Sequence, residues 1–375
     1  MLLTLKDDCK AVNLYSLFKT VCECERRPMQ WINTIIIQLY KGKGDKCDFS
    51  NQRFIHMKED ISKSFEQIVV TKMKPFIIKN VSKYQIGAIP GHQSSEHLFT
   101  LKSVIALYTL FDIPIIMQFY DLKKYFDSES LRDAMNSMYH CGIKGKLYRL
   151  LFELNKENRI KIKTGVGMTE CVETGENVSQ GSISGGLVSS VNLDFSINNY
   201  FKNSEYELSY VTERLQPLIF QDDLSRMSLS VKNAQAGNIF IETCMETKVL
   251  DLHGDKSCYV LIGTQGKVEK LKKEMEGNPL TLYAEKMKEK NCEKYLGDFI
   301  HTAGNSASAL ATVNDRLGKT MNYIIETRAI IEDCRINVVG GICAGLDIWE
   351  LAYIPGLLNN CETVSYTHLR AHETS

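Results

Sequence analysis

Two adjacent carboxylates, Asp222 and Asp223, interrupt an apolar and β-forming run, "PLIFQDDLSRMSLS". Burying two neighbouring anions is costly unless a cation or a proton compensates. Successive side chains in a strand point to opposite faces, so both carboxylates can approach one site only where the chain bends sharply. The pattern predicts a tight hairpin, entering over residues 218–220 and returning over residues 227–231. An ordinary Asp-containing turn is the alternative, because Asp favours turns through its own backbone hydrogen bonds.

A third carboxylate, Asp121, ends the apolar segment "PIIMQFYD", which predicts a buried strand. If this strand lies beside the hairpin, three carboxylates converge. Phosphoryl transfer to a hydroxyl uses two divalent ions, and Mg²⁺ prefers carboxylate oxygens as ligands. The three residues are therefore candidate ligands of two Mg²⁺ ions.

The remaining elements predict an α+β protein in which a sheet packs on helices. Residues 28–40 read as a β-rich segment, and residues 58–76 repeat apolar residues at helical spacing. Two helical patterns separated by Gly142 follow Asp121, and "RIKIKTG" then predicts a hairpin with the segment after it. A Gly/Ser loop, "SQGSISGG", precedes a further helix, and "KSCYVLIG" predicts another strand.

Overall composition excludes few functions. The formal net charge is +0, but Lys and Arg exceed acidic residues between positions 41 and 84, which fits either a phosphate-binding surface or a solvated basic face. No apolar run has the length of a membrane helix, and the N-terminal apolar stretch is too short for a signal peptide. We therefore expect an intracellular protein without a membrane partner.

The order of these motifs resembles the reverse transcriptase domain of non-LTR (LINE-like) retrotransposons, from about Trp31 to Thr363. The segments that carry the resemblance are "LYKGKGDKCDFSNQRFIHM", "YQIGAIPGHQSSEHLFTL", "FYDLKKYFDS", "SQGSISGG", "FQDD", "EKYLG" and "YIPGLLNNCET". The resemblance implies a right-hand polymerase with an antiparallel palm sheet packed on helices. It also implies RNA-directed DNA synthesis from dNTPs on an RNA template, starting at a DNA or RNA primer 3′ end, with two Mg²⁺ ions.

The resemblance further implies a division into subdomains. We expect an N-terminal extension over 1–27, fingers over 28–115, a palm over 116–300 with a fingers-like insertion at about 131–178, and a truncated thumb over 301–363. The final segment, "VSYTHLRAHETS" at 364–375, resembles the translation of a sequencing-library adaptor and is excluded from the fold. An endonuclease domain is expected elsewhere in the full-length element, and the nucleus and cytoplasm are the expected locations.

The family motifs also assign roles to single residues. Asp121, Asp222 and Asp223 would be the catalytic, metal-binding carboxylates. Residues expected to contact the incoming nucleotide are Arg53, Lys41, Lys43, Phe126, Gln180, Gly181 and Lys256, and those of the primer grip are Tyr295, Leu296 and Gly297.

Three of these assignments have a physical reason. The planar fork of Arg53 suits phosphate oxygens, although a surface Arg beside a loop has the same sequence. Phe126 would lie under the sugar and exclude a ribose 2′-hydroxyl, or it is a core phenylalanine. Lys256 would donate a proton near the pyrophosphate, or it is a solvated residue at a strand end.

The chain departs from the family at two places. Residues 182–186 read "SISGG", where the family more often has a proline-containing "CPLSP" pattern, and Gln221 replaces a commoner small residue, with its side chain expected to point away from the metals. Two alternatives stay open. One is a group II intron-type reverse transcriptase, and the other is an inactive or domesticated copy that binds nucleic acid without synthesis.

Overall fold

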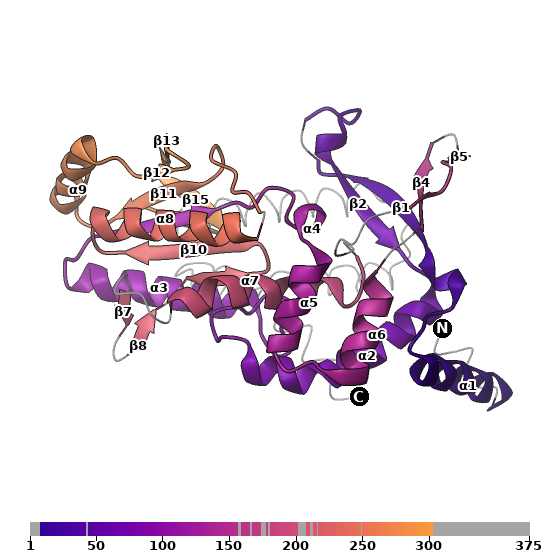
Figure 1. The fold of residues 1–375 in the computed structure, drawn as a ribbon. Coiled ribbons are helices and arrows are strands. Elements are labelled where there is room, and N and C mark those ends of the chain that lie inside the picture. The colour runs from indigo at the N-terminus through magenta and orange to yellow at the C-terminus, as the bar shows by residue number, and fades with distance from the viewer. Residues whose placement is uncertain are drawn as a thin grey trace, which may run out of the picture. The chain divides into compact units, whose positions relative to one another are not determined.

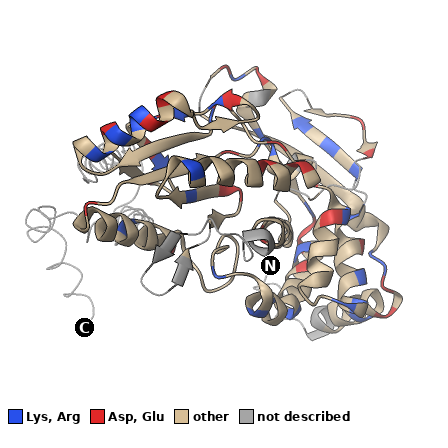
Figure 2. Ribbon diagram, turned by 60° about the vertical axis from the view of Figure 1, so that its left-hand side comes forward, with Lys and Arg blue, Asp and Glu red and all other residues tan. Residues whose placement is uncertain are grey.

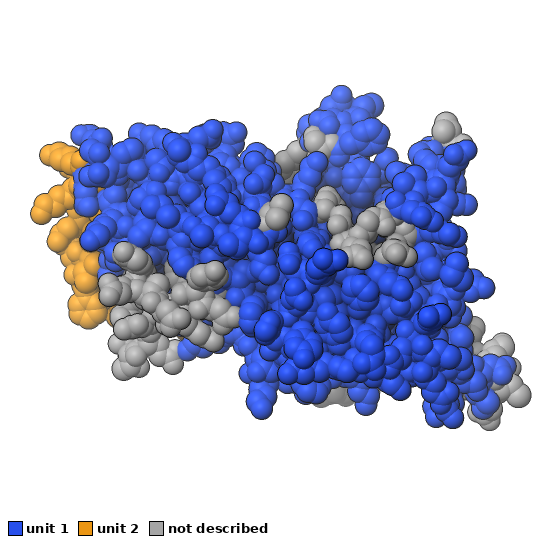
Figure 3. Space-filling view, viewed as in Figure 1, with its two compact units in different colours: residues 1–93, 117–258, 274–288 blue, residues 94–116, 259–273, 289–375 orange. Residues whose placement is uncertain are grey.

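The computed structural model describes residues 8–42, 44–156, 159–165, 167–173, 178, 181–201, 208–210, 213–215, 217–248 and 250–302 (Figure 1). The chain divides into two compact units (Figure 3), the first containing residues 1–93, 117–258 and 274–288 and the second residues 94–116, 259–273 and 289–375. Every predicted catalytic and nucleotide-binding position falls in the first unit, and the predicted primer grip falls in the second. The boundaries of fingers, palm and thumb stay predictions.

Helices form where apolar residues recur at intervals of three and four. Those of the first unit are α1 (Asp8–Cys24), α2 (Asp60–Asn80), α4 (Tyr125–Ser128), α5 (Leu131–His140), α6 (Gly145–Asn155), α7 (Gly185–Phe201) and α8 (Val231–Thr247), with 3-10 helices at Met29–Ile32 and Phe49–Asn51. Helix α5 begins at Ser130, whose hydroxyl accepts a hydrogen bond from the Asp133 amide. It ends just before Gly142, which has a positive φ of 97°. The predicted pair of helices around Gly142 is confirmed.

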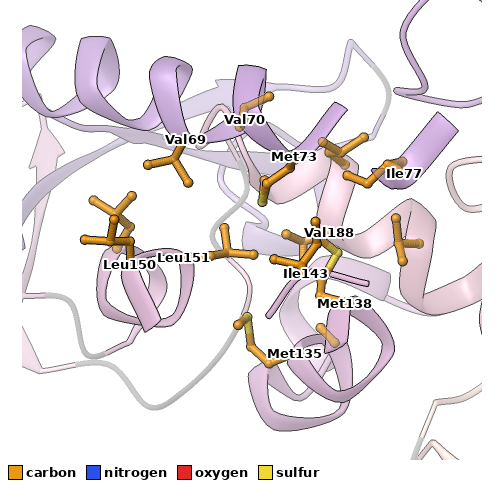
Figure 4. Packing of buried hydrophobic residues seen from close by; sticks show 14 of the residues in the cluster. Val69, Val70, Met73, Ile77, Met135, Met138, Ile143, Leu150, Leu151 and Val188 are labelled. Carbon is orange, nitrogen blue, oxygen red and sulfur yellow. The ribbon is translucent and has the colours of Figure 1, made fainter. Parts of the chain in front are cut away.

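Helices α2, α5, α6 and α7 share the main hydrophobic core (Figure 4). Met73 and Ile77 of α2 lie with Met138 of α5 and with Ile143, and all four side chains are 0% exposed. Val188 of α7 reaches the same cluster. Each buried side chain of this size stabilises the fold by roughly 1.5–3 kcal/mol. The core therefore holds α7, the helix after the Gly/Ser loop, firmly against α5.

A mixed sheet lies in the same unit. Its strands are β1 (Asn33–Tyr40), β2 (Gln52–Met57), β4 (Arg159–Thr164), β5 (Gly167–Met168) and β6 (Val172–Glu173). Strand β1 runs antiparallel to β2 and parallel to β4, and β4 pairs antiparallel with both β5 and β6. The β-rich segment predicted over 28–40 and the hairpin predicted after "RIKIKTG" are both confirmed.

A second sheet has the strand order β14-β11-β3-β10-β9. Its strands are β3 (Ile115–Tyr120), β9 (Leu218–Phe220), β10 (Asp223–Ser228), β11 (Cys258–Ile262) and β14 (Lys288–Glu289). Strands β3 and β11 are buried along their whole length, which explains their continuous apolar sequences. Helix α8 packs against β10 (Figure 1). The strands predicted at "PIIMQFY" and "KSCYVLIG" are confirmed.

The remaining elements are small or lie in the second unit. They are α3 (Ser94–Leu110), α9 (Gln265–Gly277), β15 (Cys292–Tyr295) and β16 (Asp298–His301), and the short pairs β7 (Leu208–Tyr210) with β8 (Glu213–Leu215) and β12 (Thr281–Leu282) with β13 (Glu285–Lys286). An ion pair between Lys102 and Asp298 joins α3 to β16. No helix in the described part of the chain could cross a membrane. Residues 303–375, with nearly all of the expected thumb and the tail, lie outside the described residues.

Candidate active site

The adjacent carboxylates lie at the tip of a tight hairpin, as predicted. Strands β9 and β10 pair antiparallel with Phe220 opposite Asp223, so Gln221 and Asp222 form a two-residue turn. Gln221 has a φ of 56°, the left-handed conformation that bends the chain here. The predicted return over residues 227–231 is wrong in extent, because β10 already begins at Asp223 and α8 begins at Val231. Asp223 is thus the first residue of the return strand.

A segment before α3 supports the hairpin from one side. The Ile86 amide donates to the Ile219 carbonyl at 3.1 Å, and the Ile219 amide donates to the Tyr84 carbonyl at 2.8 Å. Between them, Gln85 Oε1 accepts from the Gln221 amide at 3.2 Å. These bonds extend the sheet beyond β9 by one short stretch and fix the turn.

Gly87 is required for this close approach. A Cβ at position 87 would lie 2.1 Å from the Gln221 amide nitrogen and 2.6 Å from the Phe220 carbonyl carbon. Both are backbone atoms, so they cannot move aside without displacing the hairpin. The Gln221 side chain lies toward Gly87 and Gly186, since its Cγ and Nε2 are among the atoms that a Cβ there would meet.

Asp121 follows β3 and is held by the segment between α8 and β11. The His253 amide donates to the Asp121 carbonyl at 2.7 Å, and the Asp121 amide donates to Ser257 Oγ at 3.2 Å. Lys256 lies on the same segment, and its Nζ is 3.3 Å from Asp121 Oδ2. The Asp121 backbone is therefore fixed on both sides while its half-exposed carboxylate stays open to solvent.

The three carboxylates share one electrostatic environment. Desolvation by burial raises the pKa of Asp222, the negative charge of Asp121 raises it further, and Arg53 lowers it. Desolvation, then Asp222, then Asp121 raise the pKa of Asp223 to about 6, although part of that residue is exposed at the surface. Asp121 thus acts on both residues of the hairpin despite the hundred positions between them.

Oxygen donors of this kind suit a hard divalent cation, whose charge would relieve the repulsion among them. Within the described ranges, however, no three His, Cys, Asp or Glu side chains form a ready-made metal cluster. The donor set fits Mg²⁺ by its chemistry, and an ion would draw the carboxylates together.

Of the basic residues predicted to hold the triphosphate, Arg53 acts on the carboxylates. It lies in β2, and its positive charge lowers the pKa of Asp222. Lys41 directly follows β1, and its amide donates to the Asn51 carbonyl at 2.9 Å. Lys43 lies outside the described residues. Arg53 therefore acts on Asp222, as Lys256 pairs with Asp121.

Arg53 belongs to an exposed face of the first sheet that mixes basic and aliphatic side chains. Leu39 of β1 pairs with Arg53, and Ile37 of β1 pairs with Lys163 of β4. Alternation places Ile37 and Leu39 on the same face, so Arg53, Lys161 and Lys163 share it. All five side chains are exposed, and Figure 2 marks the basic residues in blue. Such a surface suits the phosphates and bases of a nucleic acid.

The Gly/Ser loop packs against β2. Gly181 has a φ of 97°, and a Cβ there would lie 3.1 Å from the His56 carbonyl oxygen. Ser184, in the part that departs from the family, is buried, and its amide donates to Glu66 Oε1 at 2.9 Å. Glu66 in turn forms a buried ion pair with Lys58 at 3.8 Å. Gln180 lies outside the described residues.

Phe126 lies in the single-turn helix α4, five residues after Asp121, and is half-buried. Its ring contacts the buried Tyr125 ring edge to face, with centroids 5.7 Å apart. The charge of Asp222 contributes to raising the pKa of Tyr125, after burial and Glu129, so α4 lies near the carboxylates. Phe126 thus lies on a short helix whose neighbouring residue, Tyr125, is acted on by the charge of Asp222.

The predicted primer-grip residues form the turn between β15 and β16 in the second unit. Tyr295 is buried, and Leu296 and Gly297 have positive φ values of 49° and 96°. The hairpin places Leu296 and Gly297, both half-buried, at its tip, and their role as a primer grip stays a prediction.

Sequence reasoning missed several residues that shape the site. Gln85 and Gly87 lie in "YQIGAIPG", where a Gly within an apolar run is a usable signal of close backbone contact. The roles of His253 and Ser257 leave no local signal, because both depend on a partner more than 130 residues away.

Comparison with known proteins gives a fold but no sequence family. No family model matches the chain, and no curated protein matches it. Apo telomerase from Candida tropicalis, truncated from its C-terminal domain, aligns with a TM-score of 0.51 and 10% identity, over 73% of this chain and 54% of that one. Telomerase from Candida albicans, in complex with a TWJ fragment of telomeric RNA, aligns with a TM-score of 0.50 and 10% identity, over 77% and 48%.

The chain spans about half the length of these telomerases. At this identity the likeness concerns the fold alone. The aligned chain has the mixed α/β architecture described above, with helices packed on sheets. The chain is similar in fold to these telomerases.

Proposed function

We propose that the chain is the polymerase domain of a non-LTR retrotransposon reverse transcriptase, which extends a primer 3′-hydroxyl with dNTPs on an RNA template. One observation carries the proposal: strand β3, which Asp121 follows, lies beside β10, which begins at Asp223 directly after Asp222, and the charge of Asp121 acts on both carboxylates of the hairpin. Repelling carboxylates placed at a strand end and a hairpin tip are costly, and nucleotidyl transfer gives a reason for them.

Asp121, Asp222 and Asp223 would hold two Mg²⁺ ions, which supply an activated 3′-hydroxyl and neutralise charge on the triphosphate. The primer 3′-hydroxyl gives its proton to water, and its oxygen forms a bond to the α-phosphorus of the dNTP as the bond to pyrophosphate breaks. Arg53 binds the phosphates and orients them by its planar fork. Lys256, beside Asp121, gives its proton to the departing pyrophosphate oxygen.

Phe126 selects the sugar in this proposal. Its half-buried ring, supported by Tyr125, leaves no room or hydrogen-bond partner for a 2′-hydroxyl. Template RNA would cross the exposed face that carries Arg53, Lys161 and Lys163, while Tyr295, Leu296 and Gly297 hold the primer. An endonuclease that nicks DNA would belong to another part of the element. The protein would be translated in the cytoplasm and would act in the nucleus.

Primer extension by the full chain on an RNA template with Mg²⁺ tests the function. We expect DNA product from wild type and a loss of roughly a thousandfold or more in Asp222→Asn, because one ligand oxygen is replaced by an amide nitrogen. Asp255→Asn is the matched control, since that exposed carboxylate pairs with Lys288.

Equal extension by wild type and Asp222→Asn would overturn the assignment of the site. Wild type that binds an RNA–DNA duplex but never extends it would favour the inactive nucleic-acid-binding copy. Preference for one folded intron RNA over other templates would favour the group II intron-type enzyme.

A further inference from the structure

A carboxylate that the catalytic proposal does not use lies fully buried beside α4. Glu129 connects α4 to α5 and is 1% exposed. Its Oε1 accepts hydrogen bonds from Tyr125 Oη at 3.2 Å and from Asn192 Nδ2 at 2.8 Å, and its Oε2 accepts from Ser189 Oγ. The donors come from two helices, α4 and α7. One carboxylate therefore joins the helix that carries Phe126 to the helix that follows the Gly/Ser loop.

The partners on α7 are themselves held in place. Asn192 Oδ1 accepts from Ser137 Oγ at 2.8 Å and from Lys248 Nζ at 3.3 Å. With its oxygen occupied by these donors, the Asn192 amide presents its nitrogen to Glu129. Ser137 lies on α5, whose core contacts with α7 are extensive. The α7 end of the connection is thus rigid.

The α4 end needs such support. Helix α4 has only four residues, and its N-cap, Lys124, has a left-handed φ of 43° and makes no capping hydrogen bond with its side chain. One helical turn has little stability of its own. Tyr125 Oη, which has a single proton, lies 2.8 Å from the Ser189 carbonyl and 3.2 Å from Glu129 Oε1. Both acceptors for this hydroxyl are supplied by Glu129 and α7.

A buried carboxylate is an expensive way to fill space, because an apolar side chain would pack there without a desolvation cost. Burial raises the pKa of Glu129 to about 7, against the effect of its hydrogen bonds and of Lys248. The titratable groups around it are Tyr125 on α4 and Lys248 after α8, and the charge of Asp222 acts on Tyr125. Burying the Glu129 carboxylate therefore costs free energy, and only a complete set of hydrogen bonds to its oxygens offsets that cost.

We propose that Glu129 is a positioning residue that sets the place of Phe126, and so the discrimination against ribonucleotides, by tying α4 to α7 through Tyr125, Ser189 and Asn192. The chain of contacts runs from α7 to Glu129, to the Tyr125 ring, and from there to the Phe126 ring. This inference rests on the proposed function, because Phe126 has a sugar to select only in a polymerase.

The test compares Glu129→Gln with Met138→Ala. Glutamine keeps the volume but replaces one carboxylate oxygen by an NH₂ group, so it offers fewer and weaker acceptor sites to Tyr125, Ser189 and Asn192. Met138→Ala opens a cavity in the hydrophobic core and leaves every side chain of the network in place. We expect Glu129→Gln to lower the preference for dNTP over rNTP by about tenfold, mainly through a higher KM for dNTP, with a smaller change in kcat. Met138→Ala should lower Tm but leave the preference unchanged.

Hydrogen exchange on the protein without nucleotide gives a second readout that needs no activity. Amides of residues 125–130 and 185–192 should exchange at least about tenfold faster in Glu129→Gln than in wild type. In Met138→Ala, any faster exchange should follow the global loss of stability. Tyr125→Phe, which keeps the ring, should have an intermediate effect on both readouts.

An unchanged nucleotide preference together with unchanged exchange in α4 would overturn the inference and leave Glu129 a merely structural residue. A wild-type protein that cannot extend a primer would overturn the proposed function instead. The exchange comparison would then decide by itself whether Glu129 holds α4.

Discussion

The Lys256 ammonium nitrogen lies 3.3 Å from Asp121 Oδ2, on the same segment that binds the Asp121 backbone through His253 and Ser257. The cation and the carboxylate therefore move together. Because both side chains are about half exposed, we attribute little stability to the pair itself. Its value lies in holding a proton donor beside the proposed reaction centre.

Lys256→Ala should reduce kcat for nucleotide addition by roughly a hundredfold while KM changes little, since general acid catalysis acts in the transition state. Single-turnover extension measures the chemical step. Lys288→Ala is the control, because Lys288 pairs with Asp255 on the same segment without contacting Asp121. A loss of the same size in both variants would show that the segment, and not the proton donor, is responsible.

Gly87→Ala should displace the hairpin that carries Asp222 and Asp223. The added Cβ would overlap the backbone at Phe220 and Gln221, and overpacking of this kind costs about 1–3 kcal/mol or more. We expect a lower Tm and a loss of extension beyond what the lower stability explains. Gly266→Ala in α9, where a Cβ would meet nothing within 4 Å, should leave both unchanged or raise Tm slightly.

Phe126→Val should increase the use of rNTP relative to dNTP by on the order of tenfold, because a smaller side chain leaves space for a 2′-hydroxyl. Competitive incorporation measured on one template gives the ratio directly. Phe195→Val, which removes a half-buried ring on α7 that stacks on His140, is a control for the loss of an aromatic side chain. If both variants keep the wild-type ratio, Phe126 is a core residue and does not select the sugar.

Glu129 makes a distinct prediction for stability against pH. Its pKa rises from 4.5 to about 7 on folding, so the folded state binds more protons than the unfolded state between these values. Its contribution to stability is therefore full below pH 4.5 and is lost as pH rises toward 7, by on the order of 3 kcal/mol at 1.36 kcal/mol for each of about 2.5 pH units.

Glu129→Gln should remove this contribution, so the difference in unfolding free energy between variant and wild type should shift in favour of the variant as pH rises from 4.5 to 7. Urea unfolding across this range measures it. The raised pKa values of Asp222 and Asp223 also make stability fall as pH rises. Both proteins contain these residues, so their contribution cancels in the comparison. A difference that does not vary with pH would contradict the raised pKa.

Elements with continuous or periodic apolar sequences were predictable. Strand β3 with Asp121 at its end, the two helices around Gly142 and the turn at Asp222 all follow from local patterns. The extent of β10 was not predictable, because its buried residues include three polar ones, Ser225, Arg226 and Ser228. Arg226 Nη1 donates to Gln118 at 3.1 Å and to Ser228 at 2.7 Å, and a strand 108 residues earlier supplies that first partner.

Long-range pairing explains the other gaps as well. The parallel alignment of β1 with β4 joins strands that lie more than a hundred residues apart, so no local pattern announces it. Glu129 was overlooked for the same reason, since its donors on α7 lie 60 and 63 positions further along the chain. A single sequence indicates where turns lie and which face of an element is apolar. It does not identify the distant residue that hydrogen-bonds to a buried polar side chain.

The two backbone hydrogen bonds that hold Asp121 have a consequence for folding during synthesis. Ser257, which accepts the Asp121 amide, is 136 residues further along, so a ribosome must release most of the first unit before that hydrogen bond can close. Domains form during synthesis at about 5–20 residues per second, and contacts this distant slow folding. A nascent chain therefore fixes Asp121 late, and fragments released before position 257 would fold around an unanchored Asp121.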